Sequence, residues 1–184
     1  MAISVQYDAR GLVILDSMTL DRLDLALLTA LRDHPRAGAL ELSRITKVAR
    51  ATVQARLQRL ETTGVVTGYG PDVDLEAAGQ HVSAFVTLEI AQGALDQLAP
   101  ELEALPTILE AYVTTGTADV LCKVGATSHA DLQETLLELN RSPSVVRTTS
   151  VVVLGTVVAP RVLPLLERSA EERDARAPAY RSRG

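Results

Sequence analysis

The chain has 184 residues, which suits one large domain or two small ones. Its apolar runs are far shorter than a membrane span, and its first residues lack the basic segment of a signal peptide. Cys122 is the only cysteine, which excludes an intramolecular disulfide and fits a reducing compartment. We therefore expect a cytoplasmic protein with no membrane partner.

The formal net charge of −5 is distributed unevenly along the chain. Residues 1–70 hold nine Lys/Arg and seven Asp/Glu, whereas residues 71–184 hold nine and sixteen. Within 41–60, a single acid, Glu41, stands among five cations: Arg44, Lys47, Arg50, Arg56 and Arg59. A local cationic patch is what a nucleic-acid backbone meets, so this segment is compatible with DNA binding. A solvated basic helix face is the alternative.

Three helices are predicted in the N-terminal part. Leucines recur at helical spacing over 20–33, where His34-Pro35 ends the pattern. A second, short helix is expected over 38–46, and a third over 50–63, which Gly64 ends. Residues 65–69 are predicted to form a short strand.

Three short helices with a tight turn at 47–49 are typical of a DNA-reading unit whose third helix enters the major groove. With Val53, Leu57 and Leu60 buried, the opposite face and flanks of that helix carry the candidate DNA-binding residues: Arg50, Thr52, Gln54, Arg56, Gln58 and Arg59. Glutamine suits adenine and arginine suits guanine. Arg56 and Arg59 are expected to contact phosphates, which position the protein without reading sequence. A protein-interaction domain is the alternative.

The C-terminal half predicts a second domain of α+β class. Period-two alternation and turn residues indicate strands over 82–90, 108–115, 120–126 and 145–158. Leucine spacing indicates helices over 95–105 and, with Ser128 as N-cap, over 128–141. The resulting βαββαβ order is that of a ferredoxin-like sandwich. The charged tail over 161–184 is expected to be mostly disordered.

Both faces of the predicted sheet are apolar. If Val82, Leu109, Val152, Leu154 and their neighbours in the alternation face the helices, the other face carries Phe85, Tyr112, Leu121, Val151 and Val153. Exposing such a patch to water is unfavourable, so we expect a two-fold homodimer. Burial by the chain's own tail is the alternative.

The segment 116–119 is predicted to be a hairpin turn with potential binding groups. Gly116 can adopt positive φ and expose backbone amides, and Thr115 and Thr117 add hydroxyls. Asp119 adds a carboxylate, so this turn has the groups that hold the carboxylate and ammonium of an amino acid. The alternative is a hairpin whose aspartate caps its own turn.

Three segments together resemble the Lrp/AsnC family of transcription regulators. They are 20–24 (LDRLD), 56–69 (RLQRLETTGVVTGY, similar to the family's R-x-x-R-L-E-x-x-G-V-I-x-G-Y) and 115–119 (TGTAD, similar to its T/S-G-x-x-D hairpin). The resemblance spans about residues 19–158. It implies an N-terminal winged helix-turn-helix, a ligand-binding second domain, dimers and often octamers. Ala49 departs from the pattern, because the family usually has a serine N-cap there.

The resemblance also implies an effector pocket at the hairpin, between dimers, completed near the last strand. With the hairpin hydroxyls, the candidate effector-binding residues are Tyr112, Thr115, Gly116, Thr117, Asp119, His129, Val151, Val152 and Val153. The expected organisation is an extension (1–17), a helix-turn-helix domain (18–69), a linker (70–80), an effector-binding and oligomerisation domain (81–160) and the tail.

We therefore predict a transcription regulator that binds double-stranded DNA, assembles as a homo-oligomer and responds to an amino acid. No catalytic set, cofactor motif or metal-ligand spacing is visible, and His34, His81 and His129 are scattered. A ligand-independent architectural DNA-binding protein is one rival. A small-molecule enzyme built on the second domain is the other.

Overall fold

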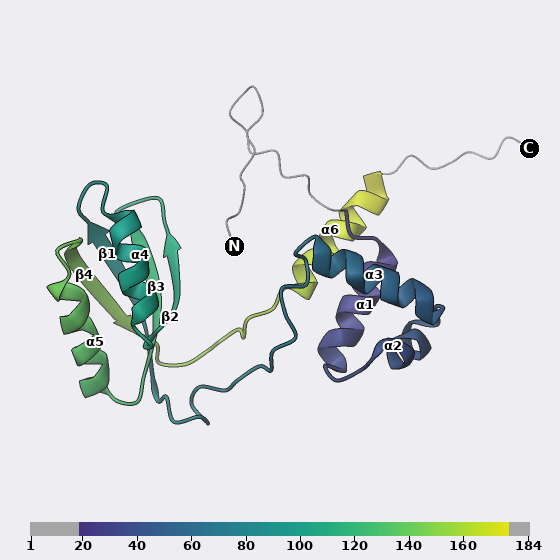
Figure 1. The fold of residues 1–184 in the computed structure, drawn as a ribbon, viewed down its shortest axis with the longest axis horizontal. Coiled ribbons are helices and arrows are strands. Elements are labelled where there is room, and N and C mark those ends of the chain that lie inside the picture. Colours follow the sequence, from purple (N-terminus) through teal and green to yellow (C-terminus); the bar gives the residue numbers. More distant parts are fainter. Residues whose placement is uncertain (1–18, 177–184) are drawn as a thin grey trace, which may run out of the picture. The chain divides into compact units, whose positions relative to one another are not determined.

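The computed structural model describes residues 19–176, which form two compact units. One contains the described residues up to Pro71 together with those from Pro160 onward, and the other is Asp72–Ala159. The expected extension 1–17 and the last eight residues lie outside the described part of the chain. Figure 1 shows the elements of both units.

The N-terminal unit contains the three predicted helices at nearly the expected positions: α1 (Arg22–Asp33), α2 (Ala39–Thr46) and α3 (Arg50–Thr62). Helix α1 begins at a capping box, in which Asp21 Oδ1 accepts from the amides of Leu23 and Asp24, both at 2.9 Å. Asp24 Oδ2 returns the contact by accepting from the Asp21 amide at 3.0 Å. The two acidic side chains also stabilise α1, because negative charge interacts favourably with the N-terminal end of the helix dipole.

Apolar side chains from all three helices form the core of this unit. Leu27, Leu42 and Val53 are fully buried or nearly so, and Leu57 packs against them. The strand expected over 65–69 is absent. A lone strand needs a partner for its backbone groups, and the described residues of this unit otherwise contribute only helices and loops.

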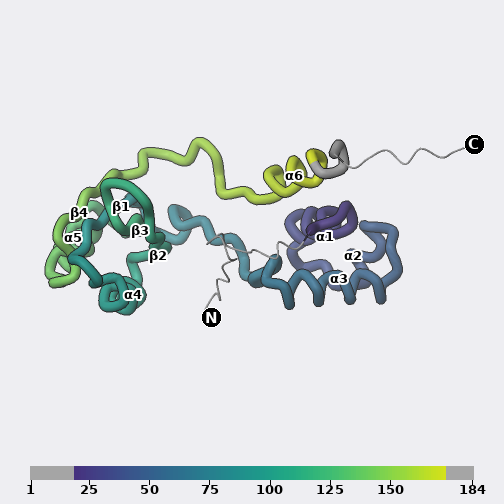
Figure 2. The backbone as a smooth tube through the Cα atoms, turned by 90° about the horizontal axis from the view of Figure 1, so that it is seen from above, coloured from purple at the N-terminus to yellow at the C-terminus, as the bar shows by residue number. Residues whose placement is uncertain are grey.

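The tail expected to be disordered instead contains a helix, α6 (Leu163–Arg176). It packs against α1, on the side of α1 away from α3 (Figure 2). The prediction of disorder was wrong for this segment because its charged composition obscured a short apolar face, which becomes ordered by packing on another helix.

The C-terminal unit is the predicted ferredoxin-like sandwich. Its strands are β1 (Val82–Ile90), β2 (Ile108–Val113), β3 (Val120–Ala126) and β4 (Val145–Val152), and its helices are α4 (Leu95–Ala104) and α5 (His129–Arg141). The sheet is antiparallel in the order β2-β3-β1-β4. Strands β2 and β4 are shorter than predicted, while Ser128 caps α5 as expected, accepting from the Asp131 amide at 3.2 Å.

One face of the sheet packs against α4 and α5, as Figure 1 shows. The alternating residues Val82, Ala84, Val86 and Leu88 of β1 are buried there with Val120, Cys122 and Val124 of β3. Leu98, Leu102, Leu132 and Leu139 of the two helices complete this core. Cys122 is fully buried, and burial raises the pKa of its thiol to about 11.

A bulge in β2 changes the predicted face of Leu109. The register with β3 shifts between Ile108 and Glu110, so Leu109 does not continue the alternation. A Cβ on Gly125 would lie 3.2 Å from a Leu109 methyl, on the face that the helices leave open. The prediction that Leu109 faces the helices was therefore wrong, as it was for Leu154, which lies beyond β4 and is fully exposed.

Candidate nucleic-acid interface and effector region

Helix α3 presents a polar, exposed face opposite its buried residues. Arg50, Thr52, Gln54 and Gln58 are all exposed, whereas Val53 and Leu60 are fully buried. The small residues Ala51 and Ala55 are exposed on the same helix. Glutamine amides can pair with base edges, and small side chains allow close approach to a groove.

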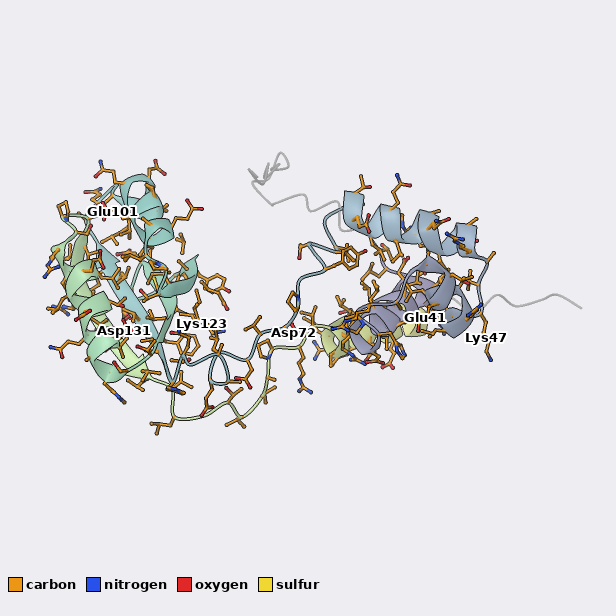
Figure 3. All side chains as sticks on the ribbon, turned by 60° about the horizontal axis from the view of Figure 1, so that its bottom comes forward. Glu41, Lys47, Asp72, Glu101, Lys123 and Asp131 are labelled. Carbon is orange, nitrogen blue, oxygen red and sulfur yellow. The ribbon has the colours of Figure 1, made fainter. Side chains whose placement is uncertain are left out.

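The turn between α2 and α3 is tight because Lys47 adopts a left-handed conformation, with φ of 57°. Figure 3 shows Lys47 in this turn. Ala49 is the N-cap of α3, and no side chain caps the helix there. The helix nevertheless begins at Arg50, as predicted, since the Val53 amide donates to the Ala49 carbonyl at 3.1 Å.

Arg56 and Arg59, the two residues expected to contact phosphates, are bound to the start of α1. Arg56 donates to Asp24 Oδ1 at 3.2 Å and also to Asp21, and Arg59 donates to Asp24 Oδ2. The Asp24 side chain is fully buried. Both guanidinium groups therefore neutralise and hold α1 rather than extending from the domain as unpaired cations.

The pKa values follow from this network. Burial alone would raise the pKa of the Asp21 carboxyl, but hydrogen bonds from the Asp24 amide and from Arg56 outweigh it and hold it below its usual value. The hydrogen bond to Asp21, with that to Asp24, raises the pKa of Arg56. Among the described residues, Arg44, Lys47 and Arg50 form no ion pair, so they are the cations of the patch available to an external partner.

Tyr69 fixes the segment that follows α3. Its hydroxyl donates to Glu61 Oε1 at 2.6 Å, and the Val66 amide donates to the Leu60 carbonyl at 3.0 Å. Burial, together with the hydrogen bond to Glu61, raises the pKa of Tyr69 to about 12. The residues that resemble the family's G-V-I-x-G-Y thus anchor the chain to the end of α3 in place of a strand.

The hairpin between β2 and β3 uses its polar groups internally. The Thr114 hydroxyl donates to the Ala118 carbonyl at 2.7 Å, and Gly116 adopts φ of 129°. Asp119 Oδ2 accepts from the Ile90 amide at 2.8 Å, at the bulge that ends the pairing of β1 with β4. This carboxylate therefore caps the end of β1 and not its own turn, as the alternative for this residue had it. Thr115, Gly116 and Thr117 remain exposed.

The candidate effector residues lie at two ends of the sheet within one subunit. The hairpin group precedes Val120, whereas His129 follows Ala126 at the other end of β3. The seven residues of β3 separate these ends by about 20 Å at the usual rise. Val151 pairs with Phe85 and Val152 with Ala84, so both lie at the His129 end. Val152 also packs against the core, which leaves Val151 as the exposed member.

A pocket of about 390 Å³ lies between α4 and β2. Leu95, Ala99, Glu103 and Val113 contribute to its lining, together with Tyr112, which is the only candidate effector residue in it. The Tyr112 hydroxyl donates to Glu110 Oε2 at 2.5 Å, and Lys123 Nζ lies 3.0 Å from Glu110 Oε1. The hydrogen bond from Tyr112, with that from Lys123, lowers the pKa of Glu110.

Sequence reasoning missed Glu110, Lys123 and the α4 side of this pocket. The available signal was the spacing of Glu110 and Tyr112, which places both on one strand face once the bulge at Leu109 is known. The bulge itself has no clear mark in the sequence, so the pairing of Glu110 with Lys123 was not predictable.

Comparison with known proteins defines the class of both units. Residues 20–67 match the model of the winged helix-turn-helix DNA-binding domain, and residues 83–163 match that of the Lrp/AsnC ligand binding domain. The HTH-type transcriptional regulator FL11 of Pyrococcus horikoshii is 30% identical over 146 residues, which cover 79% of this chain and 97% of the relative. LrpA of Mycobacterium tuberculosis is 32% identical over 143 residues, covering 77% of this chain and 95% of that protein.

Solved structures agree with this fold. The structure of Escherichia coli AsnC matches with a TM-score of 0.73 and 26% identity over 79% of this chain and 99% of its own. A transcriptional regulator from Neisseria meningitidis in complex with L-Met matches with a TM-score of 0.71 and 25% identity, covering 77% of this chain and 94% of its own.

Fold and matches together define a DNA-binding transcription regulator with a ligand-binding domain. The chain belongs to the Lrp/AsnC family, as the sequence motifs predicted. Its relatives are transcriptional regulators, and it is a regulator rather than an enzyme. No helix in residues 19–176 has the length and apolar character needed to cross a membrane.

We predict that Asp24→Asn destabilises the N-terminal unit by about 2–4 kcal/mol, because it weakens a helix cap and leaves two arginines without their buried partner. Urea unfolding followed by circular dichroism measures the change. Asp33→Asn is the matched control: Asp33 pairs with Arg32 at 2.8 Å but is half exposed, so its loss should have a much smaller effect on stability. Equal effects of the two substitutions would contradict the assignment.

Proposed function

We propose that the chain is a sequence-specific transcription regulator whose assembly or DNA affinity is modulated by a small effector, an amino acid. The observation that carries the DNA-binding part is the exposed face of α3, with Arg50, Thr52, Gln54 and Gln58 held outward while Val53 and Leu60 are buried. In this proposal the helix-turn-helix domain spans 18–69, the linker 70–80 and the effector domain 81–160.

The arginines of α3 have different roles in this proposal. Arg50, at the start of the helix, contacts a guanine edge or a phosphate, and the two glutamines read base edges. Arg56 and Arg59 act indirectly, because they bind α1 and so fix the orientation of α3 relative to α1. This differs from the expectation that both arginines contact phosphates.

Dimerisation through the open face of the sheet would present two α3 helices to a two-fold DNA site. Phe85 of β1 is 42% exposed and Val151 of β4 is 63% exposed, and the two are register partners. Tyr112 of β2 is also exposed, on the same face as Leu121 by register. An apolar surface on a β-sheet face is best covered by a second copy of the same face. Higher assemblies, including octamers, remain part of the proposal from family membership.

The proposed effector site is assembled from more than one subunit. Within one subunit the hairpin group and the His129–Val151 group are at opposite ends of β3, so a single chain does not provide both. A partner subunit would supply the second group. The L-Met bound to the Neisseria meningitidis regulator supports an amino acid as the effector class.

For DNA reading we predict that Gln54→Ala relaxes discrimination at one base pair of the operator by about 1–3 kcal/mol, or roughly ten- to a hundredfold. Binding to unrelated duplexes should change little, because the side chain is uncharged. Fluorescence anisotropy with operator and scrambled duplexes measures both affinities. Gln133→Ala, an exposed glutamine on α5, is the control. If Gln54→Ala and Gln133→Ala bind alike, the assigned face is wrong.

For assembly we predict that Phe85→Glu dissociates the dimer, because the substitution introduces a carboxylate into the apolar contact. Sedimentation velocity at several protein concentrations measures the association, and circular dichroism checks folding. Leu137→Glu, on the exposed side of α5, should leave the association unchanged. A Phe85→Glu protein that sediments like the unsubstituted chain would contradict the proposed interface.

For the effector we predict that at least one amino acid, in a panel that includes L-Met, changes the DNA affinity or the sedimentation coefficient. Operators are first selected from random duplexes, and the selection is repeated with each amino acid at millimolar concentration. A regulator gives different enrichment or affinity with its effector. Identical enrichment and sedimentation across the panel would favour an architectural protein that ignores ligands.

A further inference from the structure

Helix α6 covers the side of α1 that faces away from the helix-turn-helix core. Leu163, Leu166 and Ala170 are partly buried at helical spacing, whereas Leu165 between them is 56% exposed. On α1, Leu25 and Leu28 are also partly buried and are not part of the cluster formed with α2 and α3. At 100° per residue, Leu25 lies on the face of α1 opposite Leu27, and Leu28 lies on the face that flanks Leu27.

A favourable charge interaction accompanies the apolar contact. The hydrogen bond to Asp33 raises the pKa of Arg32, and the nearby Glu167 carboxylate of α6 adds to this effect. Arg32 lies one helical turn after Leu28, on the same side of α1. Glu167 and the apolar side chains of α6 therefore face the same side of α1. Figure 2 shows the two helices next to each other.

Almost all of helix α6 lies beyond the residues that the family models match. The match to the ligand binding domain ends at residue 163, where α6 begins. About four-fifths of this chain matches nearly the whole length of FL11 and of AsnC. The contact between α6 and α1 is therefore not explained by the fold that these proteins share.

We propose that α6 is a C-terminal latch that joins the DNA-binding unit to the ligand-binding unit of the same chain by a second connection. The first connection, residues 63–81, has nineteen residues. Hydrogen bonds from Tyr69 to Glu61 and from Val66 to Leu60 hold its first part to the end of α3, which leaves residues 70–81. These twelve residues span about 40 Å at full extension, and the hydrogen-bonded turn over 74–80 shortens this reach. The second connection, residues 153–162, has ten residues and permits only about 35 Å.

The second connection starts directly at the sheet. The Val153 amide donates to the Ser83 carbonyl at 2.8 Å, so the chain leaves the ladder only after this residue. A docked α6 thus gives the two units a second short tether, so they can adopt fewer relative positions than the first connection alone permits. The contact between α6 and α1 involves neither DNA nor an effector, so the test of the latch is independent of the tests of the proposed function.

The distance between the units tests the latch. Spin labels are attached at Arg36→Cys and Leu137→Cys, both exposed positions, one in each unit. Cys122 is buried with a raised pKa and should not react. Labelled chains are measured by pulsed electron paramagnetic resonance in a large excess of unlabelled chain, so that only distances within one chain contribute.

Leu166→Glu should undock α6 and broaden the distance distribution. Leu165→Glu adds the same charge to the exposed side of α6 and should leave the distribution unchanged. Hydrogen exchange should show protected α6 amides in the unsubstituted chain and in Leu165→Glu, and lost protection in Leu166→Glu. Unprotected α6 amides in the unsubstituted chain, or equal distributions for the two variants, would overturn the proposal.

A second variant separates the latch from the stability of the domain. A specific protease site inserted after Gly155, in the exposed segment between β4 and α6, permits cleavage of the second connection without changing the α6–α1 contact. Cleavage should broaden the distribution as Leu166→Glu does. If the distribution is the same before and after cleavage, the second connection does not restrain the units and the latch is refuted.

Discussion

The ion pairs between α1 and α3 are the interaction on which the DNA-binding unit depends. Asp24 is fully buried and serves two purposes, since it closes the capping box of α1 and accepts from Arg56 and Arg59. A buried carboxylate without these partners would be strongly destabilising. The network therefore sets where α3 crosses α1, and in doing so it determines which residues of α3 point outward.

This arrangement changes how the basic patch is understood. Five cations in the segment 41–60 suggested a surface that meets phosphates, but two of them neutralise acids that lie more than thirty residues earlier. The charge left for an external partner is smaller and is concentrated at the N-terminal end of α3 and in α2. In the proposed function, Arg50 and the glutamines contact DNA, while Arg56 and Arg59 hold α3 against α1.

Local patterns predicted most of the fold, because periodicity and caps are properties of neighbouring residues. The leucines of α1, the alternation of β1 and the Ser128 cap all identified their elements to within a residue or two. Features that depend on distant partners were not predictable. The ion pairs of Asp24, the bulge at Leu109 and the docking of α6 each require knowledge of which segments meet in space. For the same reason the effector candidates, which the family motif groups together, are separated within one subunit.

Regulation by an effector requires that a change in the ligand-binding unit alters the DNA-binding unit. The proposed effector site needs a second subunit, and the latch provides a short covalent path from the last strand to the helix that packs on α1. In both proposals, regulation depends on how subunits or units are connected and not on a pocket within one domain.

The central claim, that Arg56 and Arg59 position α3 and do not contact phosphates, is tested most directly by the salt dependence of DNA binding. The slope of log Kd against log salt concentration falls by about 0.9 for each phosphate contact that is lost. The account predicts that Arg56→Gln and Arg59→Gln, measured at a temperature where both remain folded, keep the slope of the unsubstituted chain. A slope reduced by about 0.9 in either variant would show a direct phosphate contact and contradict the account.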